Sequence, residues 1–163
     1  ADALGPRTVQ RILVTMGAGA APPVRGLRPV AAVAPGVAAA TGLSLQQLAA
    51  ALVGQLHPAA VVCVDSLCSA EGQRLGRTVQ FSDTGLYPAQ ADHTRHLTRD
   101  TLGVPVVAAG IPTLMQAQEG ADLVVTPRAL DSVIAHGAAL LACAVNRALQ
   151  PRLTVQQLCW LTG

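Results

Sequence analysis

The chain has 163 residues, enough for one domain with a sizeable core; 51% of them are hydrophobic and 12% are charged. This balance excludes a disordered chain, which would carry little apolar surface and a high net charge. The net charge is +2 and the arginines are scattered. The basic stripe that phosphate contacts need is therefore missing, and we expect no nucleic-acid binding. No uninterrupted apolar run reaches about 18 residues, so we expect no membrane partner.

The first elements are a helix, a strand and a second helix. Pro6 suits a first helical turn, and apolar residues at helical spacing predict a helix over residues 7–14. A short strand is predicted over residues 28–33. Ser44 is a favoured cap for a helix that ends at Leu56. A doubly wound domain normally opens with a strand, so we expect the first strand to come from an upstream segment.

The central stretch is an apolar, β-branched run that follows Pro58 and ends in Asp65. It predicts a strand buried on both faces of a parallel sheet, with the acid at its carboxyl end. In open α/β sheets, ligands and chemistry collect at that end. Asp65 is therefore the first candidate for a functional residue. A turn former or an N-cap would account for the same acid without any function.

Strands and helices continue to alternate in the second half of the chain. The predicted elements are a strand over residues 78–81, a surface loop over 83–100, strands over 104–110 and 122–126, a helix over 127–149 and a last helix capped by Thr154. The long helix has so few polar residues that we expect the last helix or another subunit to cover it. The order predicts an α/β fold in three layers, a mostly parallel sheet flanked by helices, as one domain over residues 1–163.

Asp2 lies just ahead of the first predicted helix. In a parallel sheet, the loop after the first strand and the end of a neighbouring strand lie side by side, so Asp2 and Asp65 can converge. Two carboxylates that meet share a proton. The ionised member can activate a water while the protonated member polarises a peptide carbonyl. The pair is the leading catalytic hypothesis.

Asp83, Thr84 and Gly85 form the tripeptide of pepsin-like and retroviral aspartic proteases. Those enzymes are all-β and bring two copies of the tripeptide together, whereas this α/β pattern contains one copy. A turn or N-cap role for Asp83 is therefore favoured over the role that it would have in a retroviral-type protease.

A metal site is the competing interpretation of the same acids. Asp2, Asp65 and either His93 or His96 would form a mixed carboxylate and imidazole set that suits Zn or Ni. A histidine in a loop is otherwise simply solvated. The cysteines have no metal-binding spacing, so we expect a reduced intracellular protein without a cofactor; they are Cys63, Cys68, Cys143 and Cys159.

Nine short motifs extend over essentially the whole chain. They are Asp2-Ala-Leu-Gly-Pro6, Arg28-Pro-Val30, Pro35-Gly-Val37, Thr41-Gly42, Val64-Asp-Ser-Leu67, Gln80-Phe-Ser-Asp-Thr-Gly85, Thr101-Leu-Gly-Val-Pro-Val106, Gly110-Ile-Pro-Thr113 and Val125-Thr-Pro127. In order and spacing they resemble the motifs of the spore germination protease family. Each motif is short, but the set is highly specific.

The resemblance implies an atypical aspartic endopeptidase that degrades small acid-soluble spore proteins during germination. It also implies a phosphorylase/hydrolase-like fold of the hydrogenase-maturation-protease type, a zymogen whose propeptide lies upstream of this chain, a homotetramer and a location in the spore core, which is cytoplasmic. The family's two essential aspartates correspond to Asp2 and Asp65, and Asp83 becomes a secondary candidate that orients the site.

Two other functions stay open. The first is a maturation endopeptidase that recognises a metal in its substrate, as hydrogenase-processing enzymes do, with Asp2, Asp65 and His93 as its ligands. The second is an inactive structural homologue. Its support is the stretch over residues 89–94, Ala-Gln-Ala-Asp-His-Thr, where the family usually has a glycine-rich sequence.

Overall fold

The computed structural model describes residues 3–17, 25–36, 41–87, 96–116 and 124–163. Within these ranges the chain forms one four-stranded sheet in the order β1-β3-β2, with β4 paired to β3 off this path. The strands are β1 (Val61–Cys68), β2 (Gln80–Ser82), β3 (Val106–Gln116) and β4 (Val124–Val125). β1 runs parallel to β3, whereas β2 and β4 run antiparallel to it. The predicted α/β class is confirmed, but the sheet is mixed rather than mostly parallel.

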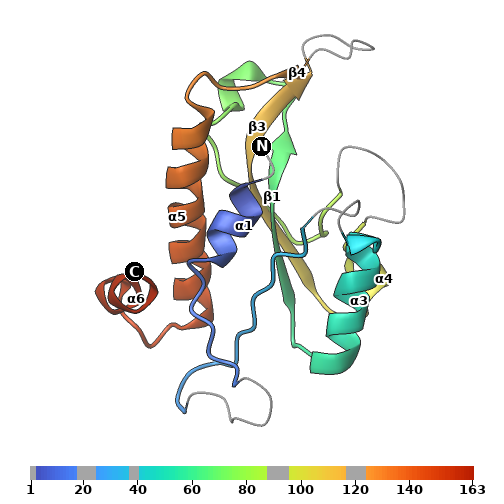
Figure 1. Cartoon of the computed structure of the whole chain (residues 1–163), viewed down its shortest axis with the longest axis vertical. Helices are drawn as coiled ribbons and strands as arrows, with labels where there is room; N and C mark the ends of the chain where they lie inside the picture. Colours follow the sequence, from blue (N-terminus) through green and yellow to red (C-terminus); the bar gives the residue numbers. More distant parts are fainter. Residues whose placement is uncertain (1–2, 18–24, 37–40, 88–95, 117–123) are drawn as a thin grey trace.

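Helices cover both faces of this sheet (Figure 1). They are α1 (Leu4–Val9), α3 (Leu45–Leu56), α4 (Arg99–Leu102), α5 (Leu130–Leu149) and α6 (Val155–Thr162), with a 3-10 turn, η1, over Gly72–Arg74. Side chains alternate along β3: Ala109 and Ile111 pack with α1 and α5, whereas Val106 and Ala108 pack with α3 and α4. This alternation divides the core into two halves, one on each face of the sheet.

Two helix starts agree with their sequence signals. The side chains of Ser44 and Thr154 accept hydrogen bonds from the backbone N–H groups of Gln47 and Gln157, and each glutamine side chain accepts from its capping residue in return. These reciprocal capping boxes satisfy amide groups that the first turn leaves without partners. The caps of α3 and α6 could therefore be predicted from local sequence alone.

The predicted strand over residues 28–33 is wrong, because this extended segment joins no ladder among the described strands. Its backbone groups bind a glutamine side chain and the backbone of another loop instead. The Gln150 carboxamide accepts from the N–H of Arg28 at 3.0 Å and donates to its carbonyl at 2.8 Å. The backbone N–H groups of Thr15 and Met16 donate to the carbonyl of Val30. The first helix also differs from the prediction, since it begins at Leu4 rather than residue 7.

The long helix α5 is packed on one side against α1 and the sheet. By length and composition alone it could also cross a membrane, a criterion that core helices meet as well. Asp131 and Arg147 lie near its ends, which is why no uninterrupted apolar run marks it in the sequence. α6 covers part of its outer side through the buried Leu158. Leu140 nevertheless stays 59% exposed.

Candidate active site

The sequence predicted Asp65 at the carboxyl end of its strand, and this prediction is wrong. Asp65 lies inside β1. It is paired with Gly110, and the strand continues to Cys68. The strand is longer than predicted because β3 extends beside it as far as Gln116, and the N–H of Ser69 still donates to the carbonyl of Leu114. The acid therefore projects from the interior of β1, which is an outer strand of the described sheet.

The Asp65 carboxylate is half-buried, and its Oδ1 accepts a hydrogen bond from the N–H of Ser66 at 2.8 Å. Because side chains two positions apart share a face of a strand, Asp65 and Cys63 both face α3 and α4. Burial raises the pKa of the Cys63 thiol to about 11, and the negative charge of Asp65 raises it further in the same direction. The Asp65 carboxylate thus acts electrostatically on the Cys63 thiol in the half of the core under α3 and α4.

The raised pKa of Cys63 predicts a loss of stability at alkaline pH. The folded thiol has a pKa of about 11 against an ordinary value of 9.0. Its contribution to the free energy of unfolding is therefore complete below pH 9 and disappears as the pH rises through 11. The two-unit difference corresponds to roughly 2 to 3 kcal/mol. Urea unfolding at pH 8 and pH 10.5 measures it. The chain contains no lysine, whose ammonium group would otherwise titrate in the same range.

A Cys63→Ala variant is the control for this prediction. It should lose most of the difference in unfolding free energy between the two pH values. Thiol labelling of the native protein gives a second check, because Cys68 and Cys159 are exposed and should react while Cys63 stays protected. An equal alkaline loss in the variant would contradict the assignment to Cys63.

Asp2 and His93, the other predicted site residues, lie outside the described residues. The start of α1 nonetheless lies against the strand that carries Asp65. A Cβ atom added to Gly5 would stand 2.8 Å from the carbonyl oxygen of Val64, so only a glycine allows this approach. The segment that follows Asp2 in sequence is therefore packed beside β1 at the level of the acid, on the α5 side of the sheet, whereas the Asp65 side chain faces α3 and α4.

Asp83 lies in an exposed turn directly after β2. Within this turn the hydroxyl groups of Ser82 and Thr84 are 2.7 Å apart, and the N–H of Thr84 donates to Ser82 Oγ at 3.2 Å. Gly85 then takes a positive φ of 107°. These contacts are those of a tight turn, which agrees with the structural interpretation of the Asp-Thr-Gly tripeptide.

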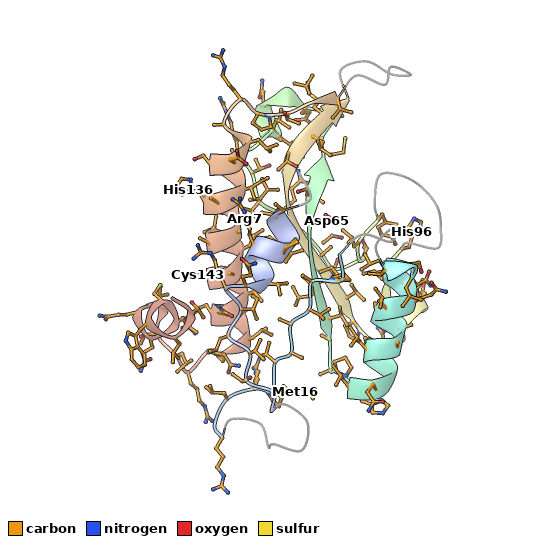
Figure 2. All side chains as sticks on the ribbon, viewed as in Figure 1. Arg7, Met16, Asp65, His96, His136 and Cys143 are labelled. Carbon is orange, nitrogen blue, oxygen red and sulfur yellow. The ribbon has the colours of Figure 1, made fainter. Side chains whose placement is uncertain are left out.

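His96, the alternative metal ligand, packs its ring edge-on against Tyr87 with 4.8 Å between the ring centroids. Figure 2 shows it above α3, on the same side of the sheet as α4, whereas His136 lies on α5 at the opposite side. Across the described ranges, no three His, Cys, Asp or Glu side chains gather in a metal-binding group. The proposed set with Asp2 and His93 includes undescribed residues and remains a prediction.

Sequence reasoning did not single out Gln80, which lies in one lateral row with Asp65. β3 pairs Gly110 with Asp65 on one side and with Gln80 on the other. Each of the three residues belongs to one of the nine motifs, but the row that they form becomes visible only in the strand register. Thr113, which is fully buried, has no hydrogen-bond partner for its hydroxyl among the described residues, and nothing in the structure explains it.

Two hollows flank α5 on the other side of the sheet. One has a volume of about 230 Å³ and is lined by Arg7, Gln10, Arg11, Ala135 and Ala138. The other, of about 380 Å³, lies between α5 and residues 76–79 and includes His136 and Leu140. Neither is lined by Asp65 or Asp83, so these volumes do not locate the candidate site.

Known proteins resemble the chain in sequence. The family model described as Germination protease matches residues 1–119. The germination protease of Halalkalibacterium halodurans is 39% identical over 140 residues, which are 83% of this chain and 36% of the relative. That of Bacillus subtilis strain 168 is 39% identical over 121 residues, 71% of this chain and 33% of the relative. That of Clostridium perfringens strain ATCC 13124 is 29% identical over 208 residues, 96% of this chain and 64% of the relative. The chain thus spans about a third of two of these relatives and under two thirds of the other.

Proposed function

Since this chain belongs to the germination protease family, we propose that the full-length protein is an endopeptidase that hydrolyses small acid-soluble spore proteins in the spore core during germination. The observation that carries the proposal is the position of Asp65. A half-buried carboxylate projects from the middle of a sheet strand, and the start of α1 lies against the same strand. Asp2, directly ahead of α1, supplies the second carboxylate.

In the proposed reaction, the ionised carboxylate is that of Asp65. The Ser66 N–H donates to its Oδ1, and a hydrogen bond to the charged form favours that form. Asp65 takes a proton from a water molecule, whose oxygen attacks the carbonyl carbon of the peptide. The protonated Asp2 donates a hydrogen bond that polarises the carbonyl and keeps its proton. When the C–N bond breaks, the amine leaves with the proton that Asp65 had taken. Asp83 orients the neighbouring turn without exchanging a proton.

The same proposal includes a zymogen that assembles as a homotetramer of the peptidase domain. Exposed apolar side chains on the α5 and α6 side of the molecule support subunit contacts. Trp160 is 83% exposed and Leu140 is 59% exposed. Large apolar side chains that are this exposed are frequent in interfaces. Sedimentation analysis of the full-length protein measures the assembly.

The catalytic pair is tested by replacing Asp2 or Asp65 with asparagine in the full-length protein. Each change should lower kcat for cleavage of a small acid-soluble spore protein by about 10²–10⁴-fold, because it removes one half of the acid and base chemistry. Asp83→Asn should cost less than about tenfold. Asp100→Asn is the matched control, since Asp100 is an exposed residue in the first turn of α4.

Three outcomes would contradict the proposal. Full activity in both asparagine variants would show that Asp2 and Asp65 are not the catalytic pair. Loss of activity with a chelator, restored by Zn or Ni, would favour the maturation endopeptidase that binds metal through Asp2, Asp65 and His93. A folded wild-type protein that cleaves no spore protein would favour the inactive homologue.

A further inference from the structure

The row formed by Asp65, Gly110 and Gln80 crosses three neighbouring strands. In the ladder, Gly110 lies between its two partners, and all three residues project to the face that α3 and α4 cover. Strands are spaced by about 4.8 Å, so Asp65 and Gln80 stand about 9.6 Å apart at their Cα atoms. Their side chains project from either side of a residue that has none.

Because Gly110 has no side chain, the side chain of Leu67 occupies the space above it. A Cβ atom added there would lie 2.7 Å from Cγ of Leu67, which means that Leu67 packs down onto the glycine. Leu67 is two residues beyond Asp65 on β1 and shares its face. The row therefore has an apolar floor with a carboxylate at one side and a carboxamide at the other.

Each of these side chains is half-buried, so the row remains within reach of solvent. The Gln80 carboxamide forms no hydrogen bond with any residue in the described part of the chain, although its backbone is paired to β3. A carboxamide carries two donor hydrogens and one acceptor oxygen, and at a half-buried position these groups are open to water or to a bound ligand. A peptide group offers the matching acceptor and donor.

We propose that Gln80 is a further catalytic residue, whose Nε2–H donates a hydrogen bond to the oxygen of the scissile carbonyl across the row from Asp65. This inference rests on the proposed function. As the water oxygen attacks the carbonyl carbon, the C=O π electrons move onto oxygen. Gln80 stabilises the resulting negative charge, and Asp65 holds the proton from water until the amine leaves with it. Donors that face developing charge act mainly in the transition state.

The test compares Gln80→Ala and Gln80→Glu in the full-length protein with a small acid-soluble spore protein as substrate. Both variants lose the donor, so kcat should fall by about 10²–10³-fold while KM changes less than about threefold. The melting temperature should not move, because no described residue depends on the carboxamide. Gln80→Glu adds a second carboxylate to the row and should move the acidic limb of the pH–rate profile to higher pH.

Gln55→Ala is the control, since Gln55 is exposed on α3 and undergoes the same chemical change. A Gln80→Ala variant with kcat within threefold of wild type, while Asp65→Asn is inactive, would overturn this inference and leave the proposed function intact. A rise in KM alone would overturn the catalytic role as well, since it would assign Gln80 to binding. If Asp65→Asn stays active, or the wild-type protein cleaves nothing, the proposed function fails and this inference fails with it.

Discussion

A Gly85→Ala variant is expected to lose about 4 kcal/mol or more of unfolding free energy, a large part of the 5–15 kcal/mol that domains commonly have. Gly85 has a φ of 107°, which side chains disfavour. An added Cβ atom would also lie 2.9 Å from Cα of Thr98, and closer still to the carbonyl oxygen of Leu97. Both obstacles are backbone atoms.

The neighbouring backbone has little freedom to move away. Leu86 and Leu97 exchange two hydrogen bonds of 2.9 and 3.0 Å directly beside Gly85. Their side chains are 5% and 3% exposed and belong to the half of the core under α3 and α4. A shift that made room for a methyl group would therefore break these bonds and open this half of the core.

Urea unfolding of Gly85→Ala beside Gly103→Ala measures the steric part of this effect. Gly103 also has a positive φ, 73°, but no atom lies within 4 Å of its added Cβ. This control should cost only about 1 kcal/mol, the cost of the backbone conformation. Equal losses in the two variants would show that contact with Leu97 and Thr98 does not matter.

Local signals in the sequence were sufficient where short-range contacts decide the structure. Ser44 and Thr154 begin helices because each cap needs only a glutamine three residues later. The apolar run before Asp65 is a strand, as its β-branched composition indicates, but the prediction that it is buried on both faces is wrong, because only Cys63 in it is fully buried. The length of α5 was also close to the predicted range, since it begins three residues after Pro127.

Long-range pairing explains what could not be predicted. Residues 28–33 have strand composition, yet the carboxamide of Gln150, more than a hundred positions away, binds their backbone. Asp65 was expected at a strand end because an acid usually stops an apolar run, but β3 continues to pair with β1 beyond it. Gln80 shares a row with Asp65 only through the register of two ladders, one parallel and one antiparallel. Composition and periodicity contain no information about such a register.

Gly110→Ala should damage the fold and the candidate site together. The added Cβ atom would meet Cγ of Leu67 at 2.7 Å and the carbonyl oxygen of Asp65 at a still shorter distance. That oxygen belongs to the backbone of β1, so the parallel pair of strands must separate locally. Overpacking of this kind costs about 1–3 kcal/mol. The same displacement carries the Asp65 carboxylate away from Gln80, and a shift of about 1 Å can reduce a rate by about 100-fold.

Gly137→Ala is the comparison that separates this mechanism from general crowding. Its added Cβ atom would meet Cδ1 of Ile111, the free end of a flexible side chain, and alanine favours the helix by about 1 kcal/mol over glycine. Its unfolding free energy should therefore stay within about 1 kcal/mol of wild type, with activity intact. Peptidase assays below the melting temperature of each variant then isolate the site. Gly110 is paired with both Asp65 and Gln80, so its alanine variant should lose activity even in the fraction that is folded. A folded and fully active Gly110→Ala variant would mean that the spacing of this row does not govern the reaction.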